Sequence, residues 1–285
     1  MSDQLSEGRF RQVAALIERD IGIRLPPAKR SMVEGRLRKR ARSLGMAGVN
    51  EYCRALFDEG QLDVEYIHLV DLVTTNKTDF FREAEHFAFL RDVAVPRLLS
   101  TRGARRDRRL KIWSAACSIG ADAFTVAMVL EDMLRAGNLD FRYAVLGTDI
   151  STQVLGQAIG AVYPADMLVP VPAEMRRRYT MRPRDQGRQE LRITPELRAN
   201  VRFHHLNLMD TSYPFDRDVD VIFCRNVLIY FDRPTQHAVL TRLCGHLRPG
   251  GYLIVGHSES SAGGGLTGMR HVTTAIWQRE QGDAP

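Results

Sequence analysis

The stretch from Ile112 to Gly120, read as IWSAACSIG, constrains the fold of this chain more than any other feature. It begins as an apolar run typical of a buried strand and ends in a loop of small residues. A helical pattern follows at once, over 122–136, and a second apolar run over 142–148 ends at Asp149. Strand, small-residue loop, helix, strand and terminal acid form the layout of a nucleoside-binding βαβ unit.

The loop carries an incomplete glycine fingerprint, because Gly120 is its only glycine. A dinucleotide needs further glycines so that the backbone can approach its pyrophosphate, whereas a nucleoside without phosphates does not. The carboxylate of Asp149 can accept hydrogen bonds from both ribose hydroxyls. The pattern therefore favours a phosphate-free nucleoside cofactor, of which S-adenosylmethionine is the commonest.

The second half of the chain alternates between strand and helix patterns. We expect strands at 110–115, 142–148, 201–206, 219–224 and 251–256, and helices at 122–136, 151–159 and 234–247. This alternation predicts an α/β fold with a mostly parallel, Rossmann-like sheet and helices on both faces. The rhythm breaks at about 160–200, where prolines and a short alternating stretch predict an inserted short helix and a small antiparallel β-sheet.

The first part of the chain is helical throughout. Apolar spacing predicts helices at 5–19, 28–44, 49–57 and 63–73, which make residues 1–75 a small, basic helical domain. Residues 76–108 are predicted to form a linker and an aromatic-rich helix, which contributes to the cofactor site and ends near Pro96. A basic turn over 101–109 follows, and residues 109–285 form the nucleoside-binding domain.

Positive charge is concentrated at the N-terminus. The net charge is +6, and the first fifty residues hold 11 Lys/Arg against 5 Asp/Glu, while the remainder holds 29 of each kind. The densest run comprises Arg36, Arg38, Lys39, Arg40 and Arg42. Such a run binds nucleic acid or an acidic protein surface, or it forms a solvated helix face.

Several classes of protein do not fit the sequence. Its 4 cysteines are scattered without a CxxC or Cys/His cluster, so we predict neither a metal site nor disulfides. Cys117 and Cys224 fall at strand ends and are expected to be buried free thiols. No apolar run approaches the ~20 residues of a membrane span, and the N-terminal residues lack an apolar signal core. We therefore expect a soluble, cytoplasmic protein.

Polar residues follow the predicted strands where ligands of open parallel sheets bind. They are Asp122, Asp149, Asn207, Asp210 and Asn226. Any one of them is explained as a turn former, but four loops converging on one edge favour a binding site.

General bases are scarce at this edge, since no Ser-His-Asp set or close carboxylate pair stands out. Transfer of an activated methyl group to a carboxylate needs no base, because a carboxylate is ionised above pH ~4–5. Arg82 is the natural cation to orient such a carboxylate. The alternative for Arg82 is a surface ion pair with Glu85, one helical step away.

Six segments resemble the chemotaxis receptor methyltransferase family, CheR. Residues 75–83, TNKTDFFRE, are similar to its TNxTxFFR signature, and residues 223–231, FCRNVLIYF, are similar to its most specific motif. The other matches are 113–120, 147–151, 201–208 and 251–259, and the resemblance runs in order from about residue 9 to 275.

The resemblance implies S-adenosylmethionine-dependent methylation of receptor glutamates to methyl esters, with S-adenosylhomocysteine as the second product. It implies that Arg82 and Tyr230 lie near the transferred methyl group. It also implies that the Arg36–Arg42 helix faces the acidic cytoplasmic helices of the receptor, and that the 160–200 insertion can touch the receptor. The resemblance and the loop pattern together give the cofactor contacts as Asn76, Thr78, Arg82, Gly120, Asp122, Asp149, Asn207, Leu208, Asn226 and Val227.

The chain departs from the family after the glycine loop. The family usually has Gly-Glu-Glu-Pro-Tyr there, and one of these glutamates is expected to hold the cofactor's ammonium group. This chain has Ala121 and Asp122 instead of the two glutamates. Either Asp122 substitutes, or the chain is a regulatory module that binds the cofactor with weak or lost catalysis. A nucleic-acid methyltransferase is the third alternative, motivated only by the basic N-terminus.

Overall fold

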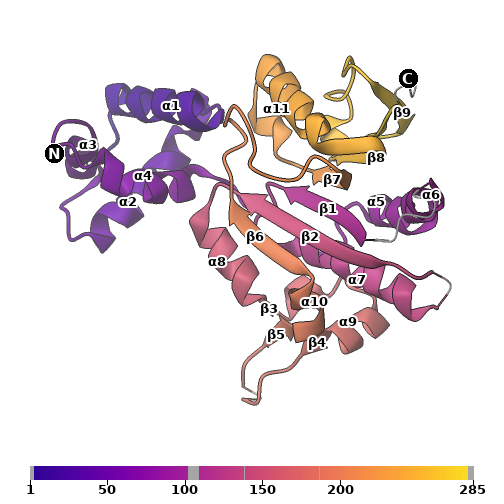
Figure 1. Ribbon diagram of the computed structural model, residues 1–285. Coiled ribbons are helices and arrows are strands. Elements are labelled where there is room, and N and C mark those ends of the chain that lie inside the picture. The colour runs from indigo at the N-terminus through magenta and orange to yellow at the C-terminus, as the bar shows by residue number, and fades with distance from the viewer. Residues whose placement is uncertain (1–2, 102–108, 138, 186, 282–285) are drawn as a thin grey trace.

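A seven-stranded sheet forms the centre of the protein (Figure 1). The computed structural model describes residues 3–101, 109–137, 139–185 and 187–281. The strand order is β6-β2-β1-β7-β8-β10-β9, in which the first five strands are parallel and β10 is antiparallel to β8 and β9. The predicted Rossmann-like sheet is therefore confirmed. The strands are β1 (Arg109–Ala115), β2 (Arg142–Asp149), β6 (Val201–His205), β7 (Val219–Cys224), β8 (Leu247–Val255), β9 (Met269–Thr273) and β10 (Ile276–Arg279).

Alternating side chains of the sheet feed two hydrophobic cores, because successive residues of a strand point to opposite faces. On β7, Val221 and Phe223 enter one core, and Ile222 and Cys224 enter the other. The first core includes α5 (Ala84–Phe89), α6 (Val95–Thr101) and α7 (Ala121–Arg135), and the second includes α11 (Arg233–His246) and the N-terminal helices. Helices thus cover both faces, as the alternation predicted.

The N-terminal unit contains α1 (Glu7–Ile21), α2 (Arg30–Ser43), α3 (Val49–Phe57) and α4 (Leu62–Val73). Helix α1 begins where the Ser6 side chain accepts a hydrogen bond from the Arg9 amide, and it ends at Gly22 with φ 74°. The positive φ of Gly22 favours glycine, and a Cβ there would also lie 2.7 Å from Met209 Sδ. This contact joins the helical unit to the strand-end loops. None of the described helices combines the length and apolarity that crossing a membrane requires.

The segment after α8 (Thr152–Gly160) interrupts the alternation. It holds β3 (Val162–Pro164), α9 (Ala173–Tyr179), β4 (Thr180–Met181), β5 (Glu190–Ile193) and α10 (Pro195–Ala199). The small sheet has the order β3-β5-β4 with antiparallel pairings. The predicted antiparallel insertion is therefore confirmed, and Figure 1 shows it projecting below the main sheet beside α9 and α10.

The predicted aromatic-rich helix was wrong at both ends. It starts at Ala84, because Phe81 and Glu83 have φ of 54° and 55°, which a right-handed helix cannot include. The helix also does not end near Pro96. A π-helical turn at Leu90–Ala94 follows α5 and leads directly into α6, which contains Pro96. Pro96 is the second residue of α6, directly after this wider turn, and has no N–H to donate. The expected basic turn over 101–109 lies mostly outside the described residues.

The cysteine prediction is confirmed. Cys117 and Cys224, like Cys53 and Cys244, are buried and free. Burial raises the pKa of the Cys117 and Cys224 thiols well above the ordinary range, so both remain protonated at neutral pH.

Candidate functional site

A pocket lies at the carboxyl ends of β1, β2, β6 and β7, where the linker after α4 crosses the sheet edge. It contains about 840 Å³ of empty space, a volume that includes its open mouth. It is lined by Ile21, Ile23, Arg82, Asp122, Asp149, Ile150, Tyr230, Phe231 and the segments 74–78, 116–118, 206–208 and 225–227.

The pocket brings together ten of the eleven residues predicted for the site. They are Asn76, Thr78, Arg82, Asp122, Asp149, Asn207, Leu208, Asn226, Val227 and Tyr230. They come from the linker, from α7 and from the loops after β2, β6 and β7, so the expected convergence of loops on one edge is present.

Gly120 is the exception, because it is not part of the pocket lining. Its φ is +84°, and a Cβ there would lie 2.9 Å from Phe203 and 3.1 Å from Ala158. This position therefore requires glycine for backbone conformation and for packing against β6 and α8. The expectation that Gly120 contacts the cofactor has no support in this geometry, since Ala116, Cys117 and Ser118 form that wall instead.

Asp149 caps the end of β2 and is 7% exposed. Its Oδ2 accepts a hydrogen bond from the Ser118 amide at 2.8 Å, and its Oδ1 accepts one from the Ser151 amide at 2.9 Å. Burial raises the pKa of the Asp149 carboxyl, although these amides act in the opposite direction. A carboxylate has about four acceptor sites, so the Asp149 side chain can still accept a hydrogen bond from a ligand in the pocket.

The two predicted asparagines differ in what their side chains do. Asn207 donates from Nδ2 to the Asp20 carbonyl at 2.7 Å and accepts from the Met209 amide at 2.9 Å, so its side chain fixes a turn against the end of α1. The Asn207 side chain therefore acts as a turn former, which was the alternative to a role in binding. Asn226 has a φ of 58°, and its Nδ2 donates to Glu83 Oε1 at 3.3 Å.

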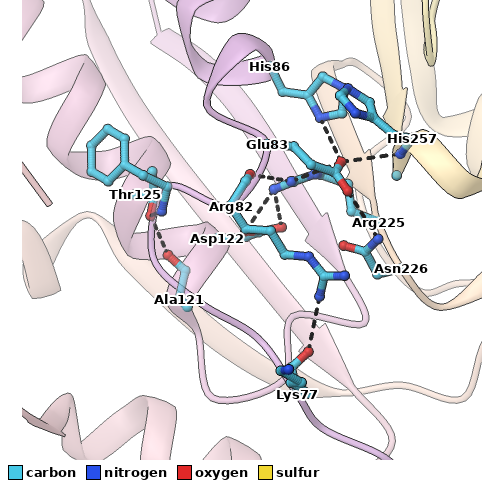
Figure 2. Close-up of polar contacts among 12 residues, drawn as sticks. Lys77, Arg82, Glu83, His86, Ala121, Asp122, Thr125, Arg225, Asn226 and His257 are labelled. Carbon is cyan, nitrogen blue, oxygen red and sulfur yellow. Dashed lines mark hydrogen bonds and ion pairs between the residues drawn. The ribbon is translucent and has the colours of Figure 1, made fainter. Parts of the chain in front are cut away.

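Arg225 organises the rear wall of the pocket, where Figure 2 shows its guanidinium between two carboxylates. Its Nη1 donates to both oxygens of Asp122 at 2.9 Å, and its Nη2 donates to Glu83 at 3.2 Å and to the Arg82 carbonyl. Removal from water raises the pKa of Asp122, and Arg225 opposes that rise. Burial also favours a higher pKa for Glu83. The charge of Arg225 and the hydrogen bonds from Arg225 and Asn226 outweigh this effect and hold the pKa of Glu83 below its usual value.

Arg82 lies half-buried at the front of the pocket. Its Nη1 donates to the Lys77 carbonyl at 3.3 Å (Figure 2). The predicted alternative partner, Glu85, is instead 2.9 Å from Nε2 of His257. Within the part of the chain that the structure describes, the Arg82 guanidinium forms no ion pair, so it is available to an anionic ligand.

Glu259 fixes the loop that carries Asn226 and Tyr230, and sequence reasoning missed it. The side chain is buried, and its oxygens accept hydrogen bonds from the amides of Gly256, Asn226 and Ile229 at 2.7–3.1 Å. Three amides held by one carboxylate explain how Asn226 keeps its left-handed conformation. The sequence signal was present, because Glu259 closes the segment 251–259 that resembles the family.

Most of the basic run is committed to contacts within the chain. Arg36 Nη1 donates to the carbonyls of Leu72 and Thr74 at 2.8 and 2.9 Å, and Arg38 and Arg40 pair with carboxylates of their own chain. The described structure leaves Lys39 and Arg42 as the exposed members of the run. The expected receptor-facing surface is therefore smaller than the sequence suggested, and its contact with a partner stays a prediction.

Comparison with known proteins agrees with this geometry. Residues 9–74 match the all-alpha domain of CheR methyltransferases, and residues 76–273 match their SAM-binding domain. The chemotaxis protein methyltransferase of Escherichia coli K12 is 38% identical over 90% of this chain and 85% of its own length, and that of Borreliella burgdorferi is 33% identical over 91% and 90%. Chemotaxis protein methyltransferase 2 of Pseudomonas aeruginosa is 38% identical over 88% and 86%. The chain therefore belongs to the CheR methyltransferase family, and S-adenosylmethionine is its cofactor.

Proposed function

We propose that this protein transfers a methyl group from S-adenosylmethionine to glutamate side chains on the cytoplasmic helices of chemotaxis receptors, forming glutamate methyl esters. Its relatives, which are chemotaxis protein methyltransferases, support methylation in chemotaxis. The observation that carries the glutamate assignment is Arg82, which presents a guanidinium that is unpaired among the described residues, in a pocket whose lining carboxylates, Asp122 and Asp149, are engaged by Arg225 and by backbone amides. This combination suits a nucleophile that is already an anion.

The residues of the pocket fit the nucleoside part of the cofactor. Asp149 lines the pocket and retains capacity to accept hydrogen bonds, which suits the ribose hydroxyls. We assign the remaining contacts to Asn76, Thr78 and the backbone at Leu208, with Val227 closing the pocket around the base.

Asp122 is our candidate for the ammonium group of the cofactor. Both its oxygens accept from Arg225, yet the side chain lines the pocket, and the set of Glu83, Arg225 and Asp122 carries one excess negative charge. A cation in the pocket is attracted by this excess. Ala121 begins α7 fully buried and has no group to offer.

The cofactor, when bound, supplies an electrophilic methyl group on a sulfonium sulfur. The residues of this chain then have to position the substrate carboxylate and exclude water. Arg82 positions the carboxylate through its paired N–H donors. Tyr230 lines the same pocket beside Phe231 and closes it from the α1 side. Displacement at the methyl carbon requires no proton transfer, since the ionised carboxylate is the nucleophile.

Three regions divide this work in our proposal. Residues 1–75 form a receptor-facing helical domain, 76–108 carry the linker and Arg82, and 109–285 bind the cofactor. The receptor is reached through Lys39 and Arg42 of α2 and through the 160–200 insertion. The enzyme acts in the cytoplasm, where those receptor helices lie.

Labelled methyl transfer tests the proposal. The wild-type chain, supplied with S-adenosylmethionine and a receptor cytoplasmic fragment, should place label on the fragment as a base-labile ester. Arg82→Ala should reduce transfer at least about 100-fold while S-adenosylhomocysteine still binds, because the substrate loses its orienting cation. Label that resists base, or no transfer to intact receptor with bound cofactor, would contradict the assignment.

Ala121 favours one second candidate, a regulatory module that binds S-adenosylmethionine or S-adenosylhomocysteine without turnover. A missing ammonium partner costs on the order of 1–3 kcal/mol of cofactor affinity. Calorimetry that shows binding, with no transfer to any receptor fragment, would select this candidate. The nucleic-acid alternative loses its motivation, because Arg36, Arg38 and Arg40 are engaged within the chain.

A further inference from the structure

Behind the cofactor pocket, three side chains that can ligate a metal converge on one point (Figure 2). Glu83 precedes α5, His86 lies in its first turn, and His257 follows β8, 174 residues beyond Glu83. One ligand atom from each lies within 4.8 Å of those of the other two. The sequence predicted no metal site, because only the fold brings His257 to the Glu83-x-x-His86 pair.

His86 shows that the cluster lacks a partner. The residue is 1% exposed, and neither Nδ1 nor Nε2 has a hydrogen-bond partner in the described structure. A buried imidazole with both nitrogens unsatisfied is costly, and an ion or water is the usual explanation. Glu83 Oε2 lies 3.5 Å from His86 Nδ1.

Glu83 has room for a further charge-assisted contact. Its contacts to Arg225, to Asn226 and to the His257 amide are 3.2–3.3 Å long, whereas charge-assisted hydrogen bonds are usually about 2.7–2.9 Å. Two carboxylates, Glu83 and Asp122, share the single guanidinium of Arg225, and a third, Glu85, lies beside His257.

His257 already has the arrangement of a metal-ligating histidine. Its Nε2 is 2.9 Å from Glu85 Oε1, which leaves Nδ1 for a metal. Ligating histidines usually donate their second N–H to a carboxylate, which orients the ring. The His86 and His257 rings stand nearly perpendicular, with centroids 4.8 Å apart.

We propose that Glu83, His86 and His257 bind a divalent transition metal, Zn²⁺ being the best match, with Glu85 orienting His257. Two imidazoles and one carboxylate suit Zn²⁺ rather than Mg²⁺ or Ca²⁺, which prefer oxygen ligands. Ligand atoms about 2.0–2.1 Å from tetrahedral zinc are roughly 3.4 Å apart. The Glu83–His86 pair is near that spacing already, and His257, 40% exposed along its side chain, is free to close the rest.

The metal would be structural, because it would link Glu83 and His86, at the start of α5, to His257 in the loop after β8. Glu83 also holds Asn226 and Arg225, so the ion would stiffen the rear wall of the pocket without touching substrate. The solvent-facing fourth position is left to water.

A Co²⁺ titration of the full, tag-free chain tests the site. After treatment with a chelator, the wild type should bind one equivalent of Co²⁺ with the visible absorption of a four-coordinate ion, and one equivalent of Zn²⁺ should displace it. His257→Ala should weaken binding at least about 100-fold, and Glu85→Gln about 10–100-fold. His237→Ala, which removes an exposed histidine from α11, is the matched control and should bind as the wild type.

Thermal unfolding gives an independent readout. One equivalent of Zn²⁺ should raise the melting temperature of the wild type but not of His257→Ala, because only a folded site binds the ion. His86→Ala disturbs a buried position, so the solvent-facing His257 variant is the decisive one. Uptake below one equivalent by the wild type, or equal uptake by the wild type and His257→Ala, would overturn the proposal.

Discussion

Two arginine–carboxylate clusters of this protein are built from similar groups and behave differently. In the helical unit, Arg40 donates two hydrogen bonds to Glu65 at 2.7 and 2.9 Å, and the Tyr52 hydroxyl donates a third at 2.9 Å. At the pocket wall, Arg225 is shared between Asp122 and Glu83.

The difference lies in the charge balance. The Arg40 hydrogen bonds hold the pKa of Glu65 below its ordinary value, as expected for one carboxylate matched to one guanidinium. Burial raises the pKa of Asp122, and Arg225, which also pairs with Glu83, opposes that rise without reversing it. A balanced cluster stabilises the fold, whereas the unbalanced cluster retains negative charge that a cationic ligand can neutralise.

Removing Arg225 should give the largest effect. In Arg225→Ala, two carboxylates lose their cation, and we expect a loss of about 3–5 kcal/mol in the free energy of unfolding. Arg225→Lys should recover only part of it, because one ammonium cannot span Asp122 and Glu83 together. Urea unfolding measures both. Arg177→Ala, which breaks an exposed pair with Glu174, is the control and should change stability by less than ~0.5 kcal/mol. If Arg225→Ala also lost less than ~0.5 kcal/mol of unfolding free energy, the rear wall would not depend on the Arg225 guanidinium.

Glu65→Gln should break the balanced cluster at a smaller cost. We expect a loss of about 1–3 kcal/mol of unfolding free energy, with the affinity for S-adenosylhomocysteine unchanged. Because the pKa of Glu65 is lowered in the folded state, its stabilisation is complete above the unfolded value of about 4.3 and disappears as the pH falls through the lowered folded value. The difference in stability between wild type and variant, followed by urea unfolding from pH 7 to pH 3, should therefore shrink. A constant difference would exclude the ionised pair as its cause.

The comparison also separates what the sequence predicts from what only the fold supplies. Asp149 and Arg82 were predictable, because the βαβ order and a local motif place them. The partners of Arg36, Arg38 and Arg40 were not, because those contacts join residues up to 38 positions apart on different elements. The sequence singled out Gly120, but for a cofactor contact rather than for packing. Glycine is needed there because Phe203 lies against its Cα, and Phe203 reaches that position only when β6 joins the sheet.

Glu83, Arg225 and Glu259 escaped prediction for a related reason. Each lies in or beside a recognised motif, but its role is a hydrogen bond to another motif more than 30 residues away. Local spacing identifies the motifs of a site. It does not show which motifs form hydrogen bonds with one another in the fold. Those contacts between motifs determine how the charges of the site are balanced.

Asp122→Asn should sharpen the comparison on the side of the unbalanced cluster. We expect about a tenfold weaker affinity for S-adenosylhomocysteine, or about 1.4 kcal/mol, since the ammonium group loses its negative partner. Because the pKa of Asp122 is raised, the wild-type carboxylate is neutralised at a higher pH than a free aspartate as the solution is acidified. Calorimetry should therefore show the wild type losing its advantage over the variant at low pH. Equal affinities at neutral pH would mean that Asp122 serves only Arg225.

The smallest effect is expected from the exposed cations of α2, which belong to neither cluster. Lys39→Ala combined with Arg42→Ala should raise the KM for a receptor fragment a few-fold and leave the affinity for S-adenosylhomocysteine unchanged, because exposed charges act mainly on encounter. The effect should fade at high salt. Arg38→Ala is the matched contrast on the same helix. Its guanidinium pairs with Asp3 at 3.1 Å and with Glu34 at 2.5 Å, so its loss should lower stability rather than raise KM. If Arg38→Ala raised KM and the double variant did not, the receptor would contact α2 through its paired arginines, and those pairs would have to open on binding.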